Sequence, residues 1–388
     1  MPKNTLRIIM VCFFLTFFLV GNSLPVKAAN IETSAESAIL IDAVSGKILY
    51  EKEAHKELPP ASVTKIMTLL VAVEAIEQGI VKLTDIVTCS DRASSLGGSQ
   101  IYLEPGEQFT LEEMLIAIAV GSANDACVAV AEHIYGTHEE FVDMMNKKAK
   151  ELKLANTNFI NSYGLPAQGH YTSAYDLAVI GREALKYPLI RKFTSIQEHD
   201  LRNGEFKLWN TNKLLWWYEG TDGFKTGWTQ EAKYCLASTV ERNGLRLIAV
   251  VMGVPEVRGH FQESMKIYNY GFAKYTYKEF APAGSKQGEI IVHKGTIPTV
   301  DLIAERAVGS SIEKGKEDSC RIETKLETSI SAPVEKGQVL GEIIIYCDNE
   351  EMNRIKLIAT ETVKKANLWE MIKRTINESY KMAPSIFT

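Results

Sequence analysis

The stretch from Pro59 to Gly79, PPASVTKIMTLLVAVEAIEQG, constrains the fold more than any other part of the chain. After Lys65 it is apolar on nearly every side, and a helix of that composition lies inside a core. The two prolines suit an extended entry into a first helical turn, and Gly79 is placed to end the helix. Ser62 and Lys65 therefore share one face at the start of a buried helix, where backbone N–H groups favour negative charge.

The Ser-x-x-Lys spacing is a weak signal by itself, because a second copy runs from Ser311 to Lys314. That copy lies in the polar, charged run SSIEKGKEDS, which we interpret as a solvated loop. The first copy gains weight from its apolar helix and from the other motifs of the chain.

The first 28 residues have the organisation of a secretory signal. Lys3 and Arg7 make the beginning basic, an apolar run of 13 residues extends from Ile8 to Val20, and the small-x-small sequence VKA ends at Ala28. A bilayer-spanning helix needs ~20 apolar residues. We therefore expect cleavage and export rather than a membrane span.

Charge and cysteine content narrow the possible partners and cofactors. Removal of the signal would take three cations from the chain and change the net charge from −5 to −8, which is unfavourable for nucleic-acid binding. Five cysteines would remain, an odd number without a Cys-x-x-Cys pair, so we expect no disulfide framework. Cys127 and Cys235 lie in apolar segments and are interpreted as buried thiols. The histidines show no paired metal spacing, and we expect no metal and no cofactor.

The remaining chain divides into three parts. Strand-like segments at 38–51 and 207–253 flank a helical middle, which predicts an α/β (α+β) domain at 29–281 with an antiparallel sheet and a helical cluster. Short alternating segments with glycine turns predict a small all-β domain at 282–362. The tail at 363–388 predicts an amphipathic helix with an apolar stripe and several cations, which we expect to lie on a membrane surface. Docking on the all-β domain is the alternative.

Local signals place the remaining candidate residues. Thr110 with Glu113, and Thr137 with Glu140, predict capping boxes at two helix starts. The sequence Asn243-Gly244 predicts a tight hairpin. Ser122-Ala123-Asn124 falls where two helices meet, and DGFKTG reads as a turn that leads into a strand.

Three motifs now follow in chain order: Ser62-x-x-Lys65, Ser122-x-Asn124 and Lys225-Thr226-Gly227. This trio is typical of penicillin-binding proteins and class A β-lactamases. The chain resembles the low-molecular-mass penicillin-binding proteins, which are serine-type D-alanyl-D-alanine carboxypeptidases. The resemblance covers nearly the whole mature chain, through ASVTKIMT, GSANDA, NSYGLPAQGHYTSAYDLA, DGFKTGWT, NGLRLIAVVMG and, in the all-β part, APVEKGQVLGEI.

The resemblance implies a transpeptidase/β-lactamase-like domain that removes the terminal D-alanine from peptidoglycan stem peptides. It also implies β-lactams as covalent inhibitors, an all-β C-terminal module, a C-terminal membrane anchor, and a place at the outer face of the cytoplasmic membrane or in the cell wall.

The catalytic roles can also be argued physically. A serine hydroxyl needs a base within reach, and Lys65 is the candidate. Its reference pKa of about 10.4 would leave it charged at neutral pH, but burial and a second cation both lower a lysine pKa. The resemblance implies that Lys225 is this cation and that Ser122 relays a proton to the leaving D-alanine.

The resemblance also implies the binding groups. The backbone N–H groups of Ser62 and Trp228 would form the oxyanion hole, and Asn124 would orient the substrate amide. Thr226 and Arg246 would hold the terminal carboxylate, for which a guanidinium is suited because it binds carboxylates in a bidentate way. Lys225 and Gly227 complete the expected substrate strand, and His170 is interpreted as structural.

Two departures from the family pattern are visible. Ala232-Lys233 stands where the family often has Ala-Gly, and Ala123 stands where glycine is frequent. Two alternatives stay open. A class A-like β-lactamase would need a glutamate that directs a water, for which we find no convincing loop. A non-catalytic penicillin-binding scaffold is compatible with the same sequence.

Overall fold

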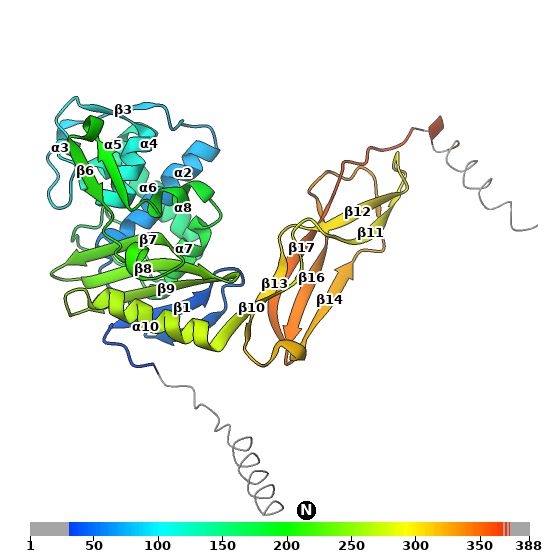
Figure 1. Cartoon of the computed structure of the whole chain (residues 1–388). Coiled ribbons are helices and arrows are strands. Elements are labelled where there is room, and N and C mark those ends of the chain that lie inside the picture. Colours follow the sequence, from blue (N-terminus) through cyan, green and yellow to red (C-terminus); the bar gives the residue numbers. More distant parts are fainter. Residues whose placement is uncertain (1–30, 368, 371, 373–388) are drawn as a thin grey trace, which may run out of the picture. The chain divides into compact units, whose positions relative to one another are not determined.

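The computed structural model describes residues 31–367, 369–370 and 372 (Figure 1). The secretory signal expected at 1–28 and most of the expected tail helix lie outside these residues. Within the described ranges, no helix has both the length and the apolar composition to cross a bilayer.

The N-terminal domain is built on a five-stranded antiparallel sheet with the order β2-β1-β9-β8-β7. The predicted hairpin near residue 40 forms β1 and β2, and β1 pairs with β9, so the two ends of the domain share one sheet, as predicted. Asn243 and Gly244 form the turn between β8 and β9 with positive φ angles of 50° and 78°. The strands are β1 (Ser37–Asp42), β2 (Ile48–Lys52), β7 (Thr221–Thr229), β8 (Lys233–Arg242) and β9 (Leu245–Val254).

Helices cover both faces of this sheet. The predicted helical cluster lies on one face, and α10 (Gly259–Lys274) packs on the other (Figure 1). The cluster consists of α2 (Lys65–Glu77), α4 (Leu111–Ile116), α5 (Asn124–Tyr135), α6 (His138–Glu151), α7 (Ala174–Ala184) and α8 (Pro188–Thr194). Shorter elements are α3 (Asp91–Ser94), α9 (Leu214–Trp217) and two ribbons, β3 (Ile86–Thr88) with β4 (Gln108–Thr110) and β5 (Glu198–Leu201) with β6 (Phe206–Trp209).

Helix α2 is the centre of the core. Every residue from Lys65 to Ala75 is buried, and Gly79 follows the helix end with a φ of +74°. Burial of each aliphatic side chain contributes roughly 1.5–3 kcal/mol to the stability of the fold, so the packing of this helix is a large part of what holds the domain together. The capping box at Thr110 is complete, whereas at Thr137 the side chain accepts the N–H of Glu140.

The C-terminal domain is all-β, as predicted, with its own apolar core. One sheet pairs β10 (Tyr275–Ala281) with β13 (Val308–Glu313), so residues 275–281 belong by their hydrogen bonds to this domain rather than to the first. The other sheet has the order β14-β16-β17-β12-β11-β15, with β14 (Cys320–Leu326), β16 (Val339–Cys347), β17 (Glu350–Ala359), β12 (Thr299–Ala304), β11 (Lys286–His293) and β15 (Ser329–Ser331).

Three expectations for this domain were wrong. Ser311 lies buried in strand β13 rather than in a solvated loop, because both faces of this strand are covered and every residue from Val308 to Ile312 is buried. Cys320 and Cys347 form a disulfide, because the register of β14 and β16 places them opposite each other. Val363 does not begin a helix; it is buried and bridges to Val334.

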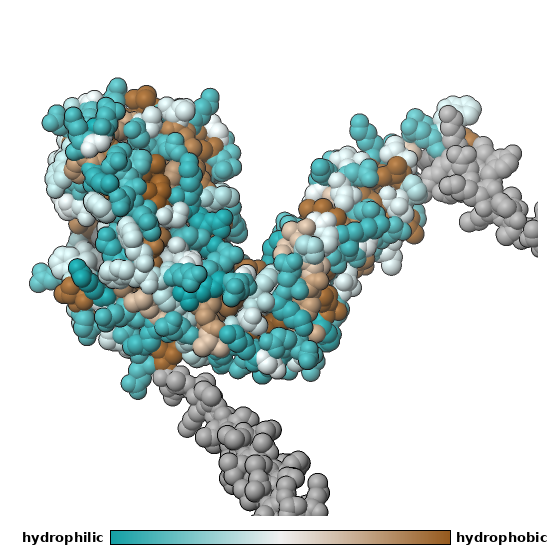
Figure 2. Space-filling model, viewed as in Figure 1, coloured by the Kyte–Doolittle hydropathy of each residue, from teal (hydrophilic) through white to brown (hydrophobic). Residues whose placement is uncertain are grey.

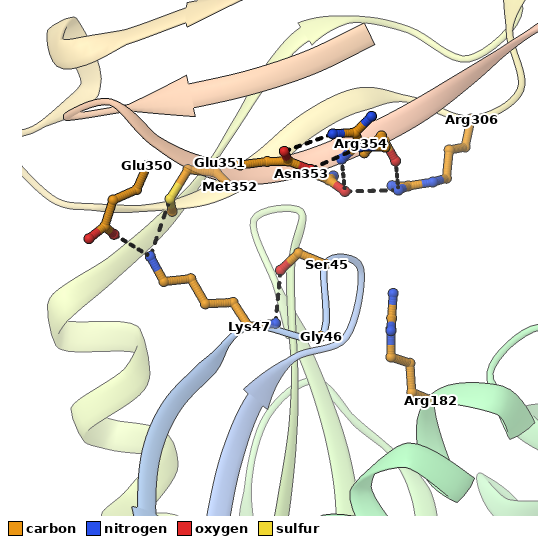
Figure 3. A pocket seen from close by; sticks show the side chains of 10 residues that line it. All are labelled: Ser45, Gly46, Lys47, Arg182, Arg306, Glu350, Glu351, Met352, Asn353 and Arg354. Carbon is orange, nitrogen blue, oxygen red and sulfur yellow. Dashed lines mark hydrogen bonds and ion pairs between the residues drawn. The ribbon is translucent and has the colours of Figure 1, made fainter. Parts of the chain in front are cut away.

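The hairpin turn after β1 also contacts the C-terminal domain. Lys47 Nζ donates to Met352 Sδ at 3.2 Å and lies 3.7 Å from the Glu350 carboxylate (Figure 3). A cavity of about 650 Å³ opens beside this contact, with Arg182 and Arg306 among its lining residues. The visible face of both domains is largely hydrophilic (Figure 2), as expected when the apolar side chains fill two cores.

Candidate active site

Ser62 and Lys65 meet at the junction of a 3₁₀ turn, η1 (Ala61–Thr64), with helix α2. Lys65 has no exposed surface, and its Nζ lies 2.9 Å from Ser62 Oγ, 2.7 Å from Asn124 Oδ1 and 2.6 Å from the Tyr163 carbonyl oxygen. Of these three partners, only the Ser62 hydroxyl has a proton to give. A neutral Lys65 would therefore keep its two N–H bonds on the two carbonyl oxygens and turn its lone pair toward Ser62.

Burial makes that neutral form accessible. It lowers the pKa of Lys65 to about 8, against the opposing influence of Cys127 and Asp125. The pKa of Lys225 is also well below its usual value, first because the side chain is buried and second because Lys65 is a nearby cation. The effect of a second cation is therefore seen on Lys225, whose pKa is lowered by Lys65, whereas the lowered pKa of Lys65 is due to burial.

A glycine allows the Tyr163 carbonyl to reach Lys65. Gly164 has a φ of +91°, and a Cβ on it would lie 1.9 Å from the Ala61 carbonyl oxygen. The segment therefore packs directly on the 3₁₀ turn that carries Ser62. This close approach explains why the sequence there contains a Tyr-Gly pair.

Ser122 and Asn124 are held at the junction of two helices. A π-helical turn, η2 (Ala117–Gly121), ends at Ser122, which is buried and adopts a left-handed conformation with φ 62°. Asn124 begins α5; its backbone N–H donates to the Ser99 carbonyl, and its Nδ2 donates to the Gly97 carbonyl at 2.7 Å. These bonds fix the amide so that its oxygen faces Lys65.

Strand β7 brings the third motif to the same place. Lys225 is buried, and Gly227 packs so tightly on the 3₁₀ turn that a Cβ would lie 2.9 Å from the Ser62 backbone nitrogen. Trp228 follows, with a side chain that is 58% exposed. The Ser62 N–H and the stretch that leads to the Trp228 N–H therefore lie side by side, as an oxyanion hole requires.

The two sequence departures are accommodated locally. Lys233 takes a positive φ of 56°, a conformation typical of glycine, and its ammonium reaches the Glu36 carboxylate at 2.9 Å. Ala123 is buried and precedes α5 in an extended conformation.

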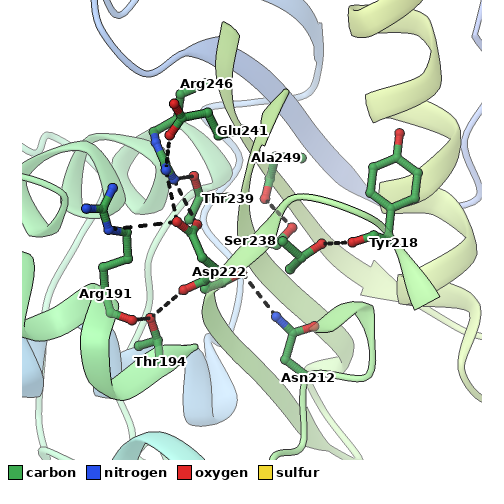
Figure 4. A network of polar contacts seen from close by, with 12 residues as sticks. Arg191, Thr194, Asn212, Tyr218, Asp222, Ser238, Thr239, Glu241, Arg246 and Ala249 are labelled. Atoms are coloured by element: carbon green, nitrogen blue, oxygen red, sulfur yellow. Dashed lines mark hydrogen bonds and ion pairs between the residues drawn. The ribbon is translucent and has the colours of Figure 1, made fainter. Parts of the chain in front are cut away.

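Arg246 does not join this site (Figure 4). Its guanidinium makes a bidentate pair with Asp222 at 2.8 and 2.9 Å and a further bond to Glu241. Burial acts to lower the pKa of Arg246, but these two carboxylates outweigh it and raise the pKa. Asp222 lies four residues before Thr226 on β7, which is roughly 13 Å along a strand. The expectation that Arg246 is placed to hold a substrate carboxylate beside Thr226 is therefore corrected: Arg246, on β9, lies beside the Asp222 end of β7, and both of its terminal nitrogens are hydrogen-bonded.

His170 occupies a structural position, as interpreted from the sequence. It is buried, its Nε2 lies 3.0 Å from Thr64 Oγ1, and its Nδ1 accepts the Ile160 N–H. Burial lowers the pKa of His170 to about 4, so the ring is neutral at physiological pH. Its two nitrogens connect the segment around Ile160 to the 3₁₀ turn that carries Ser62.

Thr211 is a site residue that the sequence did not reveal. Its Oγ1 accepts a hydrogen bond from Lys225 Nζ at 3.1 Å and one from Thr226 Oγ1 at 2.7 Å. The sequence shows only that Thr211 lies between two asparagines; the structure shows that Asn210 and Asn212 are both fully buried. Polar residues buried in this way are held by hydrogen bonds and thus mark a fixed segment.

Sequence comparisons agree with this geometry. Residues 24–256 match the family described as D-alanyl-D-alanine carboxypeptidase, and residues 275–365 match the penicillin-binding protein 5 C-terminal domain. The D-alanyl-D-alanine carboxypeptidase DacF of Bacillus subtilis is 42% identical over 356 residues, which cover 91% of this chain and 92% of that protein.

Structural comparisons lead to the same family. Penicillin-binding protein 5 from Haemophilus influenzae aligns with a TM-score of 0.72 and 34% identity over 87% of this chain and 99% of its own. Penicillin-binding protein D2 from Listeria monocytogenes, in an ampicillin-bound form, aligns with a TM-score of 0.58 and 29% identity over 63% of this chain and 99% of its own. Together with the Ser62–Lys65 geometry, these matches show that the chain belongs to the family of serine-type D-alanyl-D-alanine carboxypeptidases.

Proposed function

We propose that Ser62 is the nucleophile of this carboxypeptidase, that Lys65 is its base, and that the substrate is the D-Ala-D-Ala end of peptidoglycan stem peptides. The observation that carries the assignment is the 2.9 Å contact between the Ser62 hydroxyl and a fully buried amine whose pKa is lowered to about 8. The other two partners of that amine are carbonyl oxygens, so its lone pair is directed at the hydroxyl.

In the acylation step, Lys65 takes the Ser62 proton as Oγ attacks the carbonyl carbon of the penultimate D-alanine. The carbonyl oxygen gains the negative charge and is stabilised by the N–H groups of Ser62 and Trp228, each worth about 3 kcal/mol. The C–N bond then breaks, and the leaving D-alanine receives a proton through Ser122. An ester on Ser62 remains.

Deacylation reverses the proton path. A water molecule gives a proton to Lys65 as its oxygen attacks the ester, and Ser62 regains its proton as the shortened peptide leaves. Asn124 orients the substrate amide, and Lys225, Thr226 and Gly227 form the strand against which the peptide lies. The Lys225 charge attracts the terminal carboxylate, and the Thr226 hydroxyl turns its one proton from Thr211 Oγ1 to that carboxylate when the peptide binds.

β-Lactams would acylate the same serine and act as covalent inhibitors. The ampicillin-bound form of the Listeria protein supports this assignment by similarity. Incubation with fluorescent penicillin, digestion and mass spectrometry should find the adduct on the peptide that contains Ser62, and Ser62→Ala should abolish it. An adduct on another peptide would refute the assignment.

Two assays separate the carboxypeptidase from the alternatives. Wild type should release D-alanine from diacetyl-Lys-D-Ala-D-Ala, which a non-catalytic scaffold cannot do. The penicilloyl adduct should persist over many minutes, whereas a class A-like β-lactamase would release it within seconds. Rapid turnover of the adduct would favour the lactamase.

We further propose that the protein is exported and associates with the membrane surface through its tail. The Cys320–Cys347 disulfide supports export, because disulfides persist in oxidising compartments. Trp369 and Ile372 on the tail are 74% and 43% exposed, which favours membrane contact over docking. Full-length protein should float with vesicles of anionic phospholipid, and a variant that ends at residue 366 should not.

A further inference from the structure

We infer that Thr211 is a positioning residue that prepares Lys225 and Thr226 to recognise the substrate carboxylate. The inference rests on the proposed function, since it assigns a new residue to the same site. It also answers a question that Arg246 leaves open, because the guanidinium expected at the carboxylate is paired with Asp222.

The Thr211 hydroxyl is the point at which the two recognition groups meet. It accepts from Lys225 Nζ at 3.1 Å and from Thr226 Oγ1 at 2.7 Å, while the other acceptor for Lys225 is the Thr226 carbonyl oxygen at 3.3 Å. A hydroxyl oxygen accepts two hydrogen bonds, so both of its lone pairs are used. Thr211 thus holds the Lys225 ammonium and the Thr226 oxygen in place. When the substrate binds, the Thr226 proton turns to the carboxylate and the Thr211 hydroxyl donates to the Thr226 oxygen in exchange.

Thr211 also favours the charged form of Lys225. Burial and the neighbouring Lys65 lower the pKa of Lys225, and a neutral Lys225 would not attract a carboxylate. An acceptor that receives an N–H bond from an ammonium stabilises the charged form. The Thr211 hydroxyl therefore opposes the loss of charge at the position where charge is needed.

The backbone around Thr211 is fixed to both sides of the site. The Thr211 N–H donates to the Val120 carbonyl, two residues before Ser122, and Asn212 Nδ2 donates to the Gly223 carbonyl on β7. Asn210 Nδ2 donates to the carbonyls of Thr194 and Ile196. Thr211 is consequently placed by bonds to the helix that precedes Ser122 and to the strand that carries Lys225.

A near-isosteric substitution tests the hydroxyl directly. Thr211→Val should raise KM for diacetyl-Lys-D-Ala-D-Ala and lower kcat/KM by about 10- to 100-fold, the range for a hydrogen bond to a charged group. The alkaline limb of kcat/KM should move to lower pH, because Lys225 loses an acceptor and its pKa falls further. Thr211→Ser, which keeps the oxygen, should restore both quantities.

A substrate lacking the carboxylate isolates the recognition step. The same peptide with a C-terminal amide should be a poorer substrate for wild type, and Thr211→Val should leave the amide peptide nearly unchanged. Thr88→Val, on the exposed ribbon strand β3, should behave as wild type with both peptides. Equal losses on the acid and amide peptides would overturn the inference, as would an unshifted pH profile.

The design separates two kinds of failure. If wild type neither cleaves the acid peptide nor labels with penicillin at Ser62, the proposed function fails. If wild type does both and Thr211→Val matches it, only the role of Thr211 fails. Should Thr211→Val fold poorly, Thr211→Ala can replace it. The rate with the acid peptide is divided by the rate with the amide peptide, each per penicillin-labelled enzyme, and a ratio equal to that of wild type would overturn the inference.

Discussion

Gly227 lies so close to Ser62 that a methyl group on it would sit 2.9 Å from the Ser62 backbone nitrogen and 3.0 Å from the Pro60 carbonyl oxygen. Backbone atoms cannot move aside as a flexible side chain can. The absence of a side chain at residue 227 thus lets strand β7 rest against the turn that carries the nucleophile. This contact sets the spacing between the two proposed oxyanion donors.

Gly227→Ala should therefore separate the strand from the turn and weaken the oxyanion hole. We expect acylation by penicillin to fall by about 10²- to 10³-fold, the effect of losing one oxyanion donor. Stopped-flow measurement of the acylation rate would check this. Gly315→Ala is a control for backbone strain away from the site, since residue 315 has a φ of +86° in an exposed turn with open space around it, and it should acylate normally.

The pH dependence of acylation should report the protonation of Lys65. The base must be neutral, and its pKa is lowered to about 8, so the acylation rate should rise with pH and reach half its maximum near pH 8. The acylation rate constant for penicillin, measured from pH 6 to 9.5, provides the test. A rate that stays constant over this range would contradict Lys65 as the base.

The same shift should influence stability. The folded pKa of about 8 lies below the unfolded value of 10.5, so the unfolded state binds more protons between these values. The contribution of Lys65 to the free energy of unfolding is then present above the unfolded pKa and is lost as pH falls from about 10.5 to 8. Lys65→Met should remove this dependence in urea unfolding curves.

Asn124→Asp should move the acylation profile in a known direction. Asn124 Oδ1 lies 2.7 Å from Lys65 Nζ, and a carboxylate there would stabilise the charged amine and raise its pKa. Acylation at pH 7.5 should fall by roughly tenfold or more and recover partly at higher pH. The control is Asn146→Asp. The Asn146 amide is hydrogen-bonded to the backbone N–H and carbonyl of Phe159 and not to Lys65, so this variant should keep the wild-type pH profile of acylation.

The sequence predicted the frame of this site because its signals were local. The apolar run after Lys65 indicated a buried helix, and the alternating segments indicated an antiparallel sheet; both are present. The family resemblance implied that the three motifs share one site, and Lys65 contacts both Ser62 and Asn124, which joins two of them. Gly227 against Ser62 adds the third.

The errors came from features that depend on register. Arg246 was assigned to the carboxylate by resemblance and because a guanidinium binds carboxylates in a bidentate way, but strand pairing places it opposite Glu241. Cys320 and Cys347 are 27 residues apart and meet only because β14 and β16 align them. A strand slip of one residue would change either outcome, and composition carries no information about that slip.

Removing the disulfide should destabilise the C-terminal domain without affecting catalysis. The bond closes a loop with a sequence separation of 27, for which loop entropy gives about 3.5 kcal/mol. The double variant Cys320→Ser/Cys347→Ser should lower the thermal midpoint and label normally with penicillin. Reductant should lower the midpoint of wild type but not of the variant; an equal response in both would contradict the assignment.

Arg246 should prove to be a structural residue. Its side chain is 11% exposed and pairs with the Asp222 side chain, which is 23% exposed, and breaking a buried pair by removing one partner costs about 3–5 kcal/mol. Arg246→Gln should lower the free energy of unfolding by an amount toward the lower end of that range, since Asp222 keeps some contact with water. The double variant Asp222→Asn/Arg246→Gln should lose less than the sum of the single variants, because neither charge is then left unpaired. KM for diacetyl-Lys-D-Ala-D-Ala should stay within about twofold in folded Arg246→Gln, whereas a tenfold rise in KM with unchanged stability would return Arg246 to the carboxylate site.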